Sequence, residues 1–181
     1  MKPAPPRPTQ AQLTAAYGRR IPDLIAPRLD VLFCGINPGL YSGATGHHFA
    51  RPGNRFWRAL HAAGFTGTVL APWDERLLLE VGCGITNLVA RSTATAAELE
   101  ADEYVAGRRR LERKVQRYAP RWVAVVGRQP ERIGSAGLWV LPNPSGLNAN
   151  HQLPELTQAF RALRRAVVRG RGSKRPEPSG S

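Results

Sequence analysis

The chain carries three short, continuous apolar runs, each closed by a glycine or a proline. They are DVLFCGI (30–36), WVAVVG (122–127) and LWVLP (138–142), and GITNLV (84–89) is a weaker fourth. Short apolar runs without polar alternation are typical of strands that are buried on both faces of a parallel sheet. The pattern therefore predicts three interior strands and favours a fourth.

Between these runs, apolar residues recur at steps of three and four, which is the spacing of an amphipathic helix. Helices are expected over 54–64, 98–118 and 153–168, and the first of them begins at the N-cap residue Asn54 and stops at Gly64. Strands that alternate with helices predict an α/β fold, a three-layer α/β/α sandwich around a short, mainly parallel sheet.

The length of 181 residues suits one domain, which we place at 11–169. Residues 1–10 are Pro-rich and 170–181 are a basic Pro/Gly/Ser-rich tail, and both are expected to be disordered. The chain has neither the long apolar stretch of a membrane span nor a signal-peptide core. Cys34 and Cys83 lie in or beside apolar runs, which indicates reduced, buried thiols in a cytoplasmic protein.

Charge adds the first indication of a partner. Lys and Arg number 26 against 13 Asp and Glu, which gives a net charge of +13. Such an excess favours a polyanion, and arginine pairs bidentately with phosphate, so nucleic acid is the expected partner. An anionic membrane surface, a ribosome or the arginine bias of a GC-rich genome would also explain the charge.

Two loops that contain several glycines and prolines follow predicted strands. They are GINPGLYSGATGHHFARPGN (35–54) and LPNPSGLNANH (141–151), and long loops without regular structure are usually functional. Both leave the carboxyl ends of strands, so they are expected to meet over one crevice. Asn37, in the first loop, is either a turn residue or a side chain that projects into that crevice.

The order of four blocks carries a resemblance to a known family. FCGINPGL, GHHFARPGNRFWRAL, CGITNLV and VLPNPSGL occur in sequence, and the similarity spans residues 24 to 170. The chain resembles the mismatch-specific uracil/thymine-DNA glycosylases, a branch of the uracil-DNA glycosylase superfamily. The resemblance implies an enzyme that flips uracil out of G-mismatched duplex DNA and hydrolyses the N-glycosidic bond, leaving an abasic site. Thymine and ethenocytosine are further candidate bases.

The resemblance also assigns roles to individual residues. Asn37 would hold the attacking water, and Phe49 would stack on the flipped base unless it is a core residue. The implied base pocket is Ile36, Tyr41, Ser42, Phe49, Asn87 and Asn143, although Ser42 is equally well a plain loop serine. The implied wedge and backbone contacts are Ser145, Gly146, Leu147 and Asn148, with Leu147 as a core residue in the alternative.

No cofactor, metal ion or lyase step is implied, and the enzyme is expected to be a monomer in the cytoplasm, associated with the nucleoid of a bacterium. His47 and His48 lack zinc-ligand spacing; one is expected to be structural and the other to face a phosphate. Asn87 and Ala90 depart from relatives that have a lysine and an acidic residue at these places.

Other enzymes fit the sequence less well. A zinc deaminase needs a PCxxC motif, and an iron–sulfur glycosylase needs more than two cysteines. A catalytically silent nucleic-acid-binding module on the same fold is the main alternative. An arginine-rich ribosome-associated protein would leave the two loops unexplained.

Overall fold

A computed structural model describes residues 5–127, 136–146 and 152–171. Its centre is a four-stranded sheet in the order β2-β1-β3-β4, and all three strand pairs are parallel. The strands are β1 (Val31–Gly35), β2 (Cys83–Asn87), β3 (Trp122–Val126) and β4 (Gly137–Leu141). The sheet confirms the predicted α/β fold, including the weaker fourth strand.

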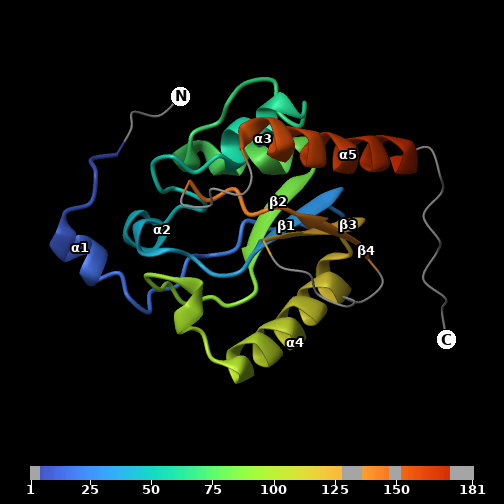
Figure 1. The fold of residues 1–181 in the computed structure, drawn as a ribbon. Coiled ribbons are helices and arrows are strands. Elements are labelled where there is room, and N and C mark those ends of the chain that lie inside the picture. The colour runs from blue at the N-terminus through green and yellow to red at the C-terminus, as the bar shows by residue number, and fades with distance from the viewer. Residues whose placement is uncertain (1–4, 128–135, 147–151, 172–181) are drawn as a thin grey trace.

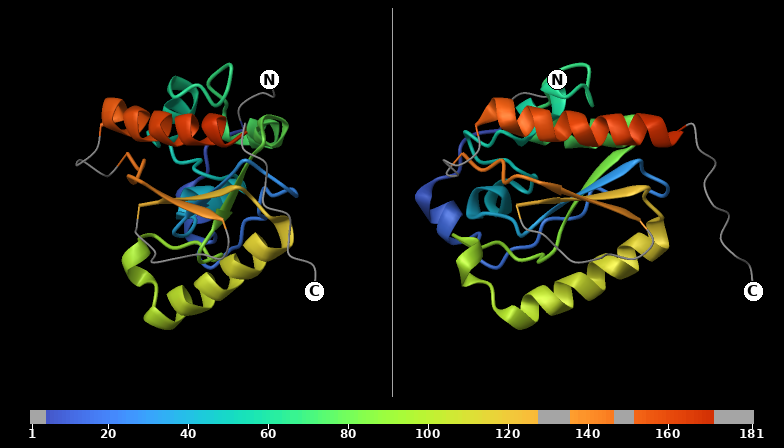
Figure 2. Two further views of the ribbon diagram at one scale, coloured as in Figure 1. Left: turned by 90° about the vertical axis from the view of Figure 1, so that its right-hand side faces the viewer. Right: turned by 45° about the vertical axis from the view of Figure 1, so that its right-hand side comes forward.

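Helices cover both faces of the sheet and make three layers (Figures 1 and 2). One face carries α4 (Ala101–Tyr118); the other carries α3 (Phe56–Ala62), α5 (Leu153–Arg171) and the 3-10 helix η1 (Pro72–Val81). Because successive side chains of a strand point to opposite faces, Phe33 packs against α3 and α5 while Leu32 and Cys34 pack toward α4.

The long helices agree with the amphipathic pattern. In α4 the buried positions are Gly107, Leu111 and Val115, at steps of four. At the start of α3 the N-cap residue is Arg55 rather than the predicted Asn54, but the Asn54 side chain still accepts a hydrogen bond from the Phe56 backbone at 2.9 Å and so satisfies one N-terminal donor.

Some regular structure was not predicted. The first loop contains a six-residue helix, α2 (Leu40–Thr45), which Gly46 ends in the left-handed region at φ 74°. Helix α1 (Gln10–Thr14), the 3-10 helices η1 and η2 (Ala96–Glu98), and the extension of α5 to Arg171 are also additions to the sequence-based assignment. These elements are short or lack a clear apolar period, so the pattern gave little signal for them.

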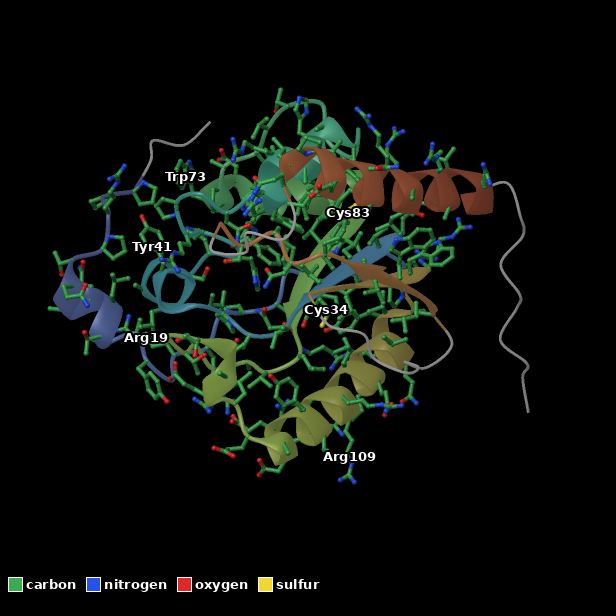
Figure 3. The ribbon with its side chains drawn as sticks, viewed as in Figure 1. Arg19, Cys34, Tyr41, Trp73, Cys83 and Arg109 are labelled. Atoms are coloured by element: carbon green, nitrogen blue, oxygen red, sulfur yellow. The ribbon has the colours of Figure 1, made fainter. Side chains whose placement is uncertain are left out.

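The two cysteines are free and buried. Burial raises the pKa of the Cys34 thiol to about 12, so it stays protonated at neutral pH. Figure 3 shows Cys34 and Cys83 inside the layers of the fold rather than at the surface. Among the described residues, no helix combines the length and the apolar character that crossing a bilayer requires.

The contact between α4 and the segment after β2 gives a stability prediction. A Cβ at Gly107 would collide with the carbonyl group of Leu88. In an exposed helix, Gly→Ala stabilises a protein by about 1 kcal/mol, but here Gly107→Ala should destabilise it by about 1 to 3 kcal/mol. Urea unfolding measures the difference, with the exposed Gln116→Ala in the same helix as control. A stabilised Gly107→Ala protein would contradict this packing.

Candidate active site

A cavity of about 750 Å³ opens at the carboxyl ends of β1, β2 and β3. This edge is where open α/β sheets bind their ligands. The lining comes from the first loop, from the segment after β2 and from the second loop. Of the predicted site residues, the cavity is lined by Ile36, Asn37, Tyr41, Ser42, Phe49, Asn87, Asn143 and Ser145.

Asn37 lies just after β1, and its side-chain amide is held by the segment that follows β2. Nδ2 donates to Thr93 Oγ1 at 2.6 Å and to the Arg91 carbonyl at 3.1 Å. Both amide hydrogens are therefore used. Within the part of the chain that the structure describes, no group donates to Asn37 Oδ1. The carbonyl oxygen of the amide thus remains an acceptor at the cavity.

The segment that holds Asn37 is itself fixed from several sides. The Thr93 hydroxyl donates to the Thr95 carbonyl at 2.7 Å, and the Thr93 backbone donates to the Pro38 carbonyl at 3.1 Å. The Arg91 guanidinium lies 2.6 Å from the Glu103 carboxylate of α4. Hydrogen bonds from Arg91 hold the pKa of Glu103 at about 2, so this ion pair persists across the neutral range.

His48 and Asn87 form a second hydrogen-bonded group in the wall of the cavity. His48 is buried, and its Nε2 lies 3.0 Å from the Pro22 carbonyl, which can only accept. Nε2 therefore carries the proton, and Nδ1 accepts from Asn87 Nδ2 at 3.3 Å. Burial lowers the pKa of His48 and keeps the ring neutral. Because Nδ1 of the neutral ring is an acceptor, the Asn87 side-chain nitrogen faces His48 and the carbonyl oxygen of the amide points away from it.

The neighbouring histidine has a different partner. His47 Nδ1 lies 3.0 Å from Glu75 Oε1, and the other oxygen of Glu75 accepts from the His48 backbone at 2.9 Å. His48 is thus the structural histidine that the sequence predicted, whereas the phosphate role of the other one stays a prediction. In the described ranges, no three His, Cys, Asp or Glu side chains gather in a metal-binding cluster.

The aromatic residues of the first loop line the same cavity. Phe49 adopts φ 51°, and its ring stacks on Phe56 with centroids 4.1 Å apart. A left-handed backbone conformation is uncommon for a bulky residue, so holding Phe49 in this conformation costs conformational free energy. Tyr41 lies on α2 (Figure 3). Ser42 Oγ accepts from the Ala50 backbone at 3.1 Å and so closes the loop on itself.

The second loop is clamped to the first one by a buried arginine. The Arg55 backbone donates to the Pro144 carbonyl at 2.9 Å, and its guanidinium donates to the Ser145 carbonyl at 2.9 Å. Asn143 Oδ1 accepts from the Ser145 backbone at 3.0 Å. A Cβ at Gly146 would lie 2.6 Å from the Gly53 carbonyl oxygen, so the two loops are in close contact there.

The two loops therefore meet as the parallel topology predicts. The predicted wedge residues Leu147 and Asn148 lie outside the described residues. Sequence reasoning missed Thr93, Arg55 and Glu75, the residues that hold the site in place. Arg55 directly follows Asn54 and precedes an apolar helix, but nothing in that pattern shows that an arginine there is buried.

The fold and the cavity define an α/β protein with a ligand site at the carboxyl edge of a parallel sheet. A family model described as the Uracil DNA glycosylase superfamily matches residues 22–166. The chain belongs to the uracil DNA glycosylase superfamily. Membership supports DNA glycosylase activity, a hydrolysis of N-glycosidic bonds, with DNA as the partner.

A solved structure agrees in fold. The chain is similar to the solution NMR structure of a "putative Uracil DNA glycosylase" from Methanosarcina acetivorans, with a TM-score of 0.55 and 20% sequence identity. The match covers 81% of this chain and 98% of that one. At this identity the similarity bears on the fold alone, and it agrees with the α/β fold of the structure.

The burial of His48 gives a prediction that does not depend on activity. Its imidazole C–H resonances should titrate below the ordinary pKa of about 6.5 in the folded protein and near 6.5 in urea. The folded pKa is the lower one, so the unfolded state gains protons first as the pH falls. The free energy of unfolding should therefore decrease as the pH falls below about 6.5, less so in His48→Gln. A folded-state midpoint at or above 6.5 would contradict the assigned burial and hydrogen bonds.

Proposed function

We propose that this protein is a monofunctional DNA glycosylase that removes uracil paired with guanine from duplex DNA. Thymine opposite guanine and ethenocytosine are further candidate bases. The protein is expected to act as a monomer in the cytoplasm, without a cofactor. The observation that carries the proposal is the orientation of Asn37, whose carbonyl oxygen is left as an acceptor at the cavity.

The chemistry follows from what an amide can do. Water attacks C1′ of the sugar, the C1′–N1 bond breaks, and its electron pair leaves with the base. Asn37 Oδ1 accepts a hydrogen bond from the water and so places it behind the sugar. An amide has no protonation change near neutral pH, so Asn37 acts by positioning rather than as a strong base. The proton of the water passes to solvent or to the departing base.

The cavity offers little beyond positioning and hydrogen bonds. None of the described residues that line it is an aspartate or a glutamate. Stabilisation of the departing base anion would come from hydrogen-bond donors of the lining, for which the Asn143 amide and the second N–H of Asn87 are candidates beside the Arg51 guanidinium. A site of this kind suits a base that leaves the helix easily, and a mispaired uracil is less costly to flip than a paired one. This reasoning supports mismatches as the preferred substrates.

The remaining walls of the cavity suit contact with a flat base and with the duplex around it. The Phe49 ring stacks on Phe56 and lines the cavity, which suits it to contact a flipped pyrimidine. The second loop, clamped by Arg55, would enter the duplex and fill the place of the flipped base. Ser145 and the backbone of this loop would contact the phosphates beside that base.

Substitution of Asn37 separates catalysis from binding. Asn37→Ala should bind duplex DNA with a U·G pair about as tightly as wild type does. It should cleave that DNA about 10²- to 10⁴-fold more slowly in single-turnover experiments, because the water loses its acceptor. A rate within a few-fold of wild type would contradict the role of Asn37. A loss of binding as large as the loss of rate would mean that Asn37 acts in DNA binding rather than in the chemical step.

Thr93 offers a matched pair of variants for the orientation itself. Thr93→Val keeps the shape of the side chain but removes the oxygen that accepts from Asn37 Nδ2, whereas Thr93→Ser keeps it. Thr93→Val should slow single-turnover cleavage on the order of ten- to a hundred-fold, since small misplacements at a reacting centre are costly. Thr93→Ser should remain within a few-fold of wild type. If the two variants cleave equally, the hydrogen bond does not orient Asn37.

A further inference from the structure

The segment that follows β2 lies between two other extended stretches of the chain. On one side it contacts the loop after β1, through the parallel bridge between Gly39 and Thr93. On the other side it contacts the chain that follows helix α1, through the antiparallel bridge between Arg20 and Arg91. We call residues 9–20, which include α1, the N-terminal arm. The segment after β2 is therefore held between the first loop of the site and the N-terminal arm.

The N-terminal arm binds this segment at Ser92. The Gly18 backbone donates to the Ser92 carbonyl at 2.9 Å, and the Ser92 backbone donates to the Arg19 carbonyl at 2.8 Å. The Ser92 hydroxyl donates to the Ala16 carbonyl. The N–H group, the carbonyl group and the hydroxyl group of Ser92 are thus all bonded to the arm.

Helix α2 shelters these hydrogen bonds from solvent. Ser92 and Ala16 are both fully buried. A Cβ at Gly43 of α2 would lie 2.5 Å from the Ser92 hydroxyl oxygen, so the glycine lets the helix approach this contact closely. Figure 1 shows α1 beside α2, at the end of the molecule away from the end of α5. A buried hydrogen bond is costly to break, because its donor and its acceptor are left unsatisfied.

Ser92 lies between the two residues that accept hydrogen bonds from Asn37. The Arg91 carbonyl, which accepts from Asn37 Nδ2 at 3.1 Å, comes directly before Ser92. Thr93, whose Oγ1 accepts from the same nitrogen at 2.6 Å, comes directly after it. A shift of Ser92 would therefore move both acceptors. Through this one residue, the N-terminal arm supports the whole contact that orients the Asn37 amide.

The N-terminal arm buries little apolar surface of its own. Ala16 is its one buried residue, Leu13 is half-buried, and Tyr17 is 55% exposed. The capping box of Thr9 and Gln12 joins α1 to its own first turn rather than to the rest of the protein. The attachment of the arm therefore depends largely on the hydrogen bonds to Ser92.

We propose that Ser92 is a positioning residue for Asn37, and that the N-terminal arm acts through it. The inference rests on the proposed function, because it assigns a role in the same reaction. It adds a part of the chain that lies before residue 22, where the match to the family model begins. Small misplacements at a reacting centre are costly, so loss of these bonds should slow the chemical step more than it weakens DNA binding.

The first test removes the Ser92 hydroxyl from the full-length protein. Ser92→Ala should cleave U·G duplex on the order of ten-fold more slowly in single-turnover experiments, with a duplex affinity within about two-fold of wild type. Thr66→Val is the matched control, because it removes a buried hydroxyl that donates to the Thr68 carbonyl at 2.7 Å, beside Phe65 at the amino end of the sheet. Thr66→Val should cleave as fast as wild type. Equal losses in both variants would indicate general destabilisation and would overturn the proposal.

A second pair of variants acts from the arm and leaves the core intact. Gly18 is exposed at φ 76°, and a Cβ there would meet no described atom within 4 Å. Proline can neither adopt this φ nor donate to the Ser92 carbonyl, whereas asparagine tolerates the left-handed region and keeps the N–H group. Gly18→Pro should therefore slow cleavage as Ser92→Ala does, and Gly18→Asn should stay near the wild-type rate. Equal rates for Gly18→Pro and Gly18→Asn would remove the arm from the proposal.

Combination with Asn37→Ala shows whether Ser92 acts through Asn37. If it does, adding Ser92→Ala to the Asn37→Ala protein should slow the remaining cleavage by less than about two-fold, because the amide to be positioned is already absent. A further loss of about ten-fold in that background would mean that Ser92 supports another group. That result would overturn the proposal.

Proton exchange of the Asn37 side chain tests the proposal without any cleavage. Its amide proton resonances are assigned by their absence from the NMR spectrum of Asn37→Ala. Their exchange with water should be on the order of ten-fold faster in Ser92→Ala than in wild type, and unchanged in Thr66→Val. Equal exchange in Ser92→Ala and wild type would overturn the proposal. Faster exchange in Ser92→Ala, together with a wild type that releases no uracil, would overturn the proposed function and leave the support of Asn37 by Ser92 standing.

Discussion

The side-chain amide of Asn37 donates to Thr93 Oγ1 and to the Arg91 carbonyl, and the rest of the candidate site is arranged around these two bonds. An asparagine on a free loop would turn either its oxygen or its nitrogen toward a ligand. Here both N–H groups are engaged, so the oxygen is presented to the cavity. The bonds also tie the loop after β1 to the segment after β2. Because β1 and β2 are parallel neighbours, their carboxyl ends supply both halves of this contact.

Support for this arrangement comes from charged residues that never reach the reacting atoms. The ion pair between Arg91 and Glu103 anchors the acceptor segment to α4. On the other side of the cavity, Arg55 is buried, and its guanidinium donates a hydrogen bond to the Ser145 carbonyl of the second loop. Burial of a guanidinium costs free energy unless its hydrogen bonds are satisfied. The contact therefore fixes the position of both Arg55 and the second loop. The two loops around the cavity are thus fixed by polar contacts, while the apolar core fixes the sheet.

The elements with a strong apolar period could be predicted from the sequence. The interior strands and the long helices were predicted within a few residues, because burial on one or both faces imposes the period directly. Helix α2 was missed because its residues, LYSGAT, have no apolar stripe of that kind. Among the site residues, Asn37 stood out by its place between glycines at a strand end. Thr93 and Arg55 did not, since their partners lie 56 and 90 residues away in the chain and no local pattern records such contacts.

The central claim is that the cavity at the carboxyl edge hydrolyses the bond between uracil and its sugar. The most direct test incubates the purified protein with duplexes that differ only in the base opposite a single uracil, and measures free uracil and strand length by chromatography. The account predicts release of uracil, faster opposite guanine than opposite adenine, with the strand intact until alkali cleaves the abasic site. Absence of free uracil from either duplex, with DNA binding retained, would contradict the account.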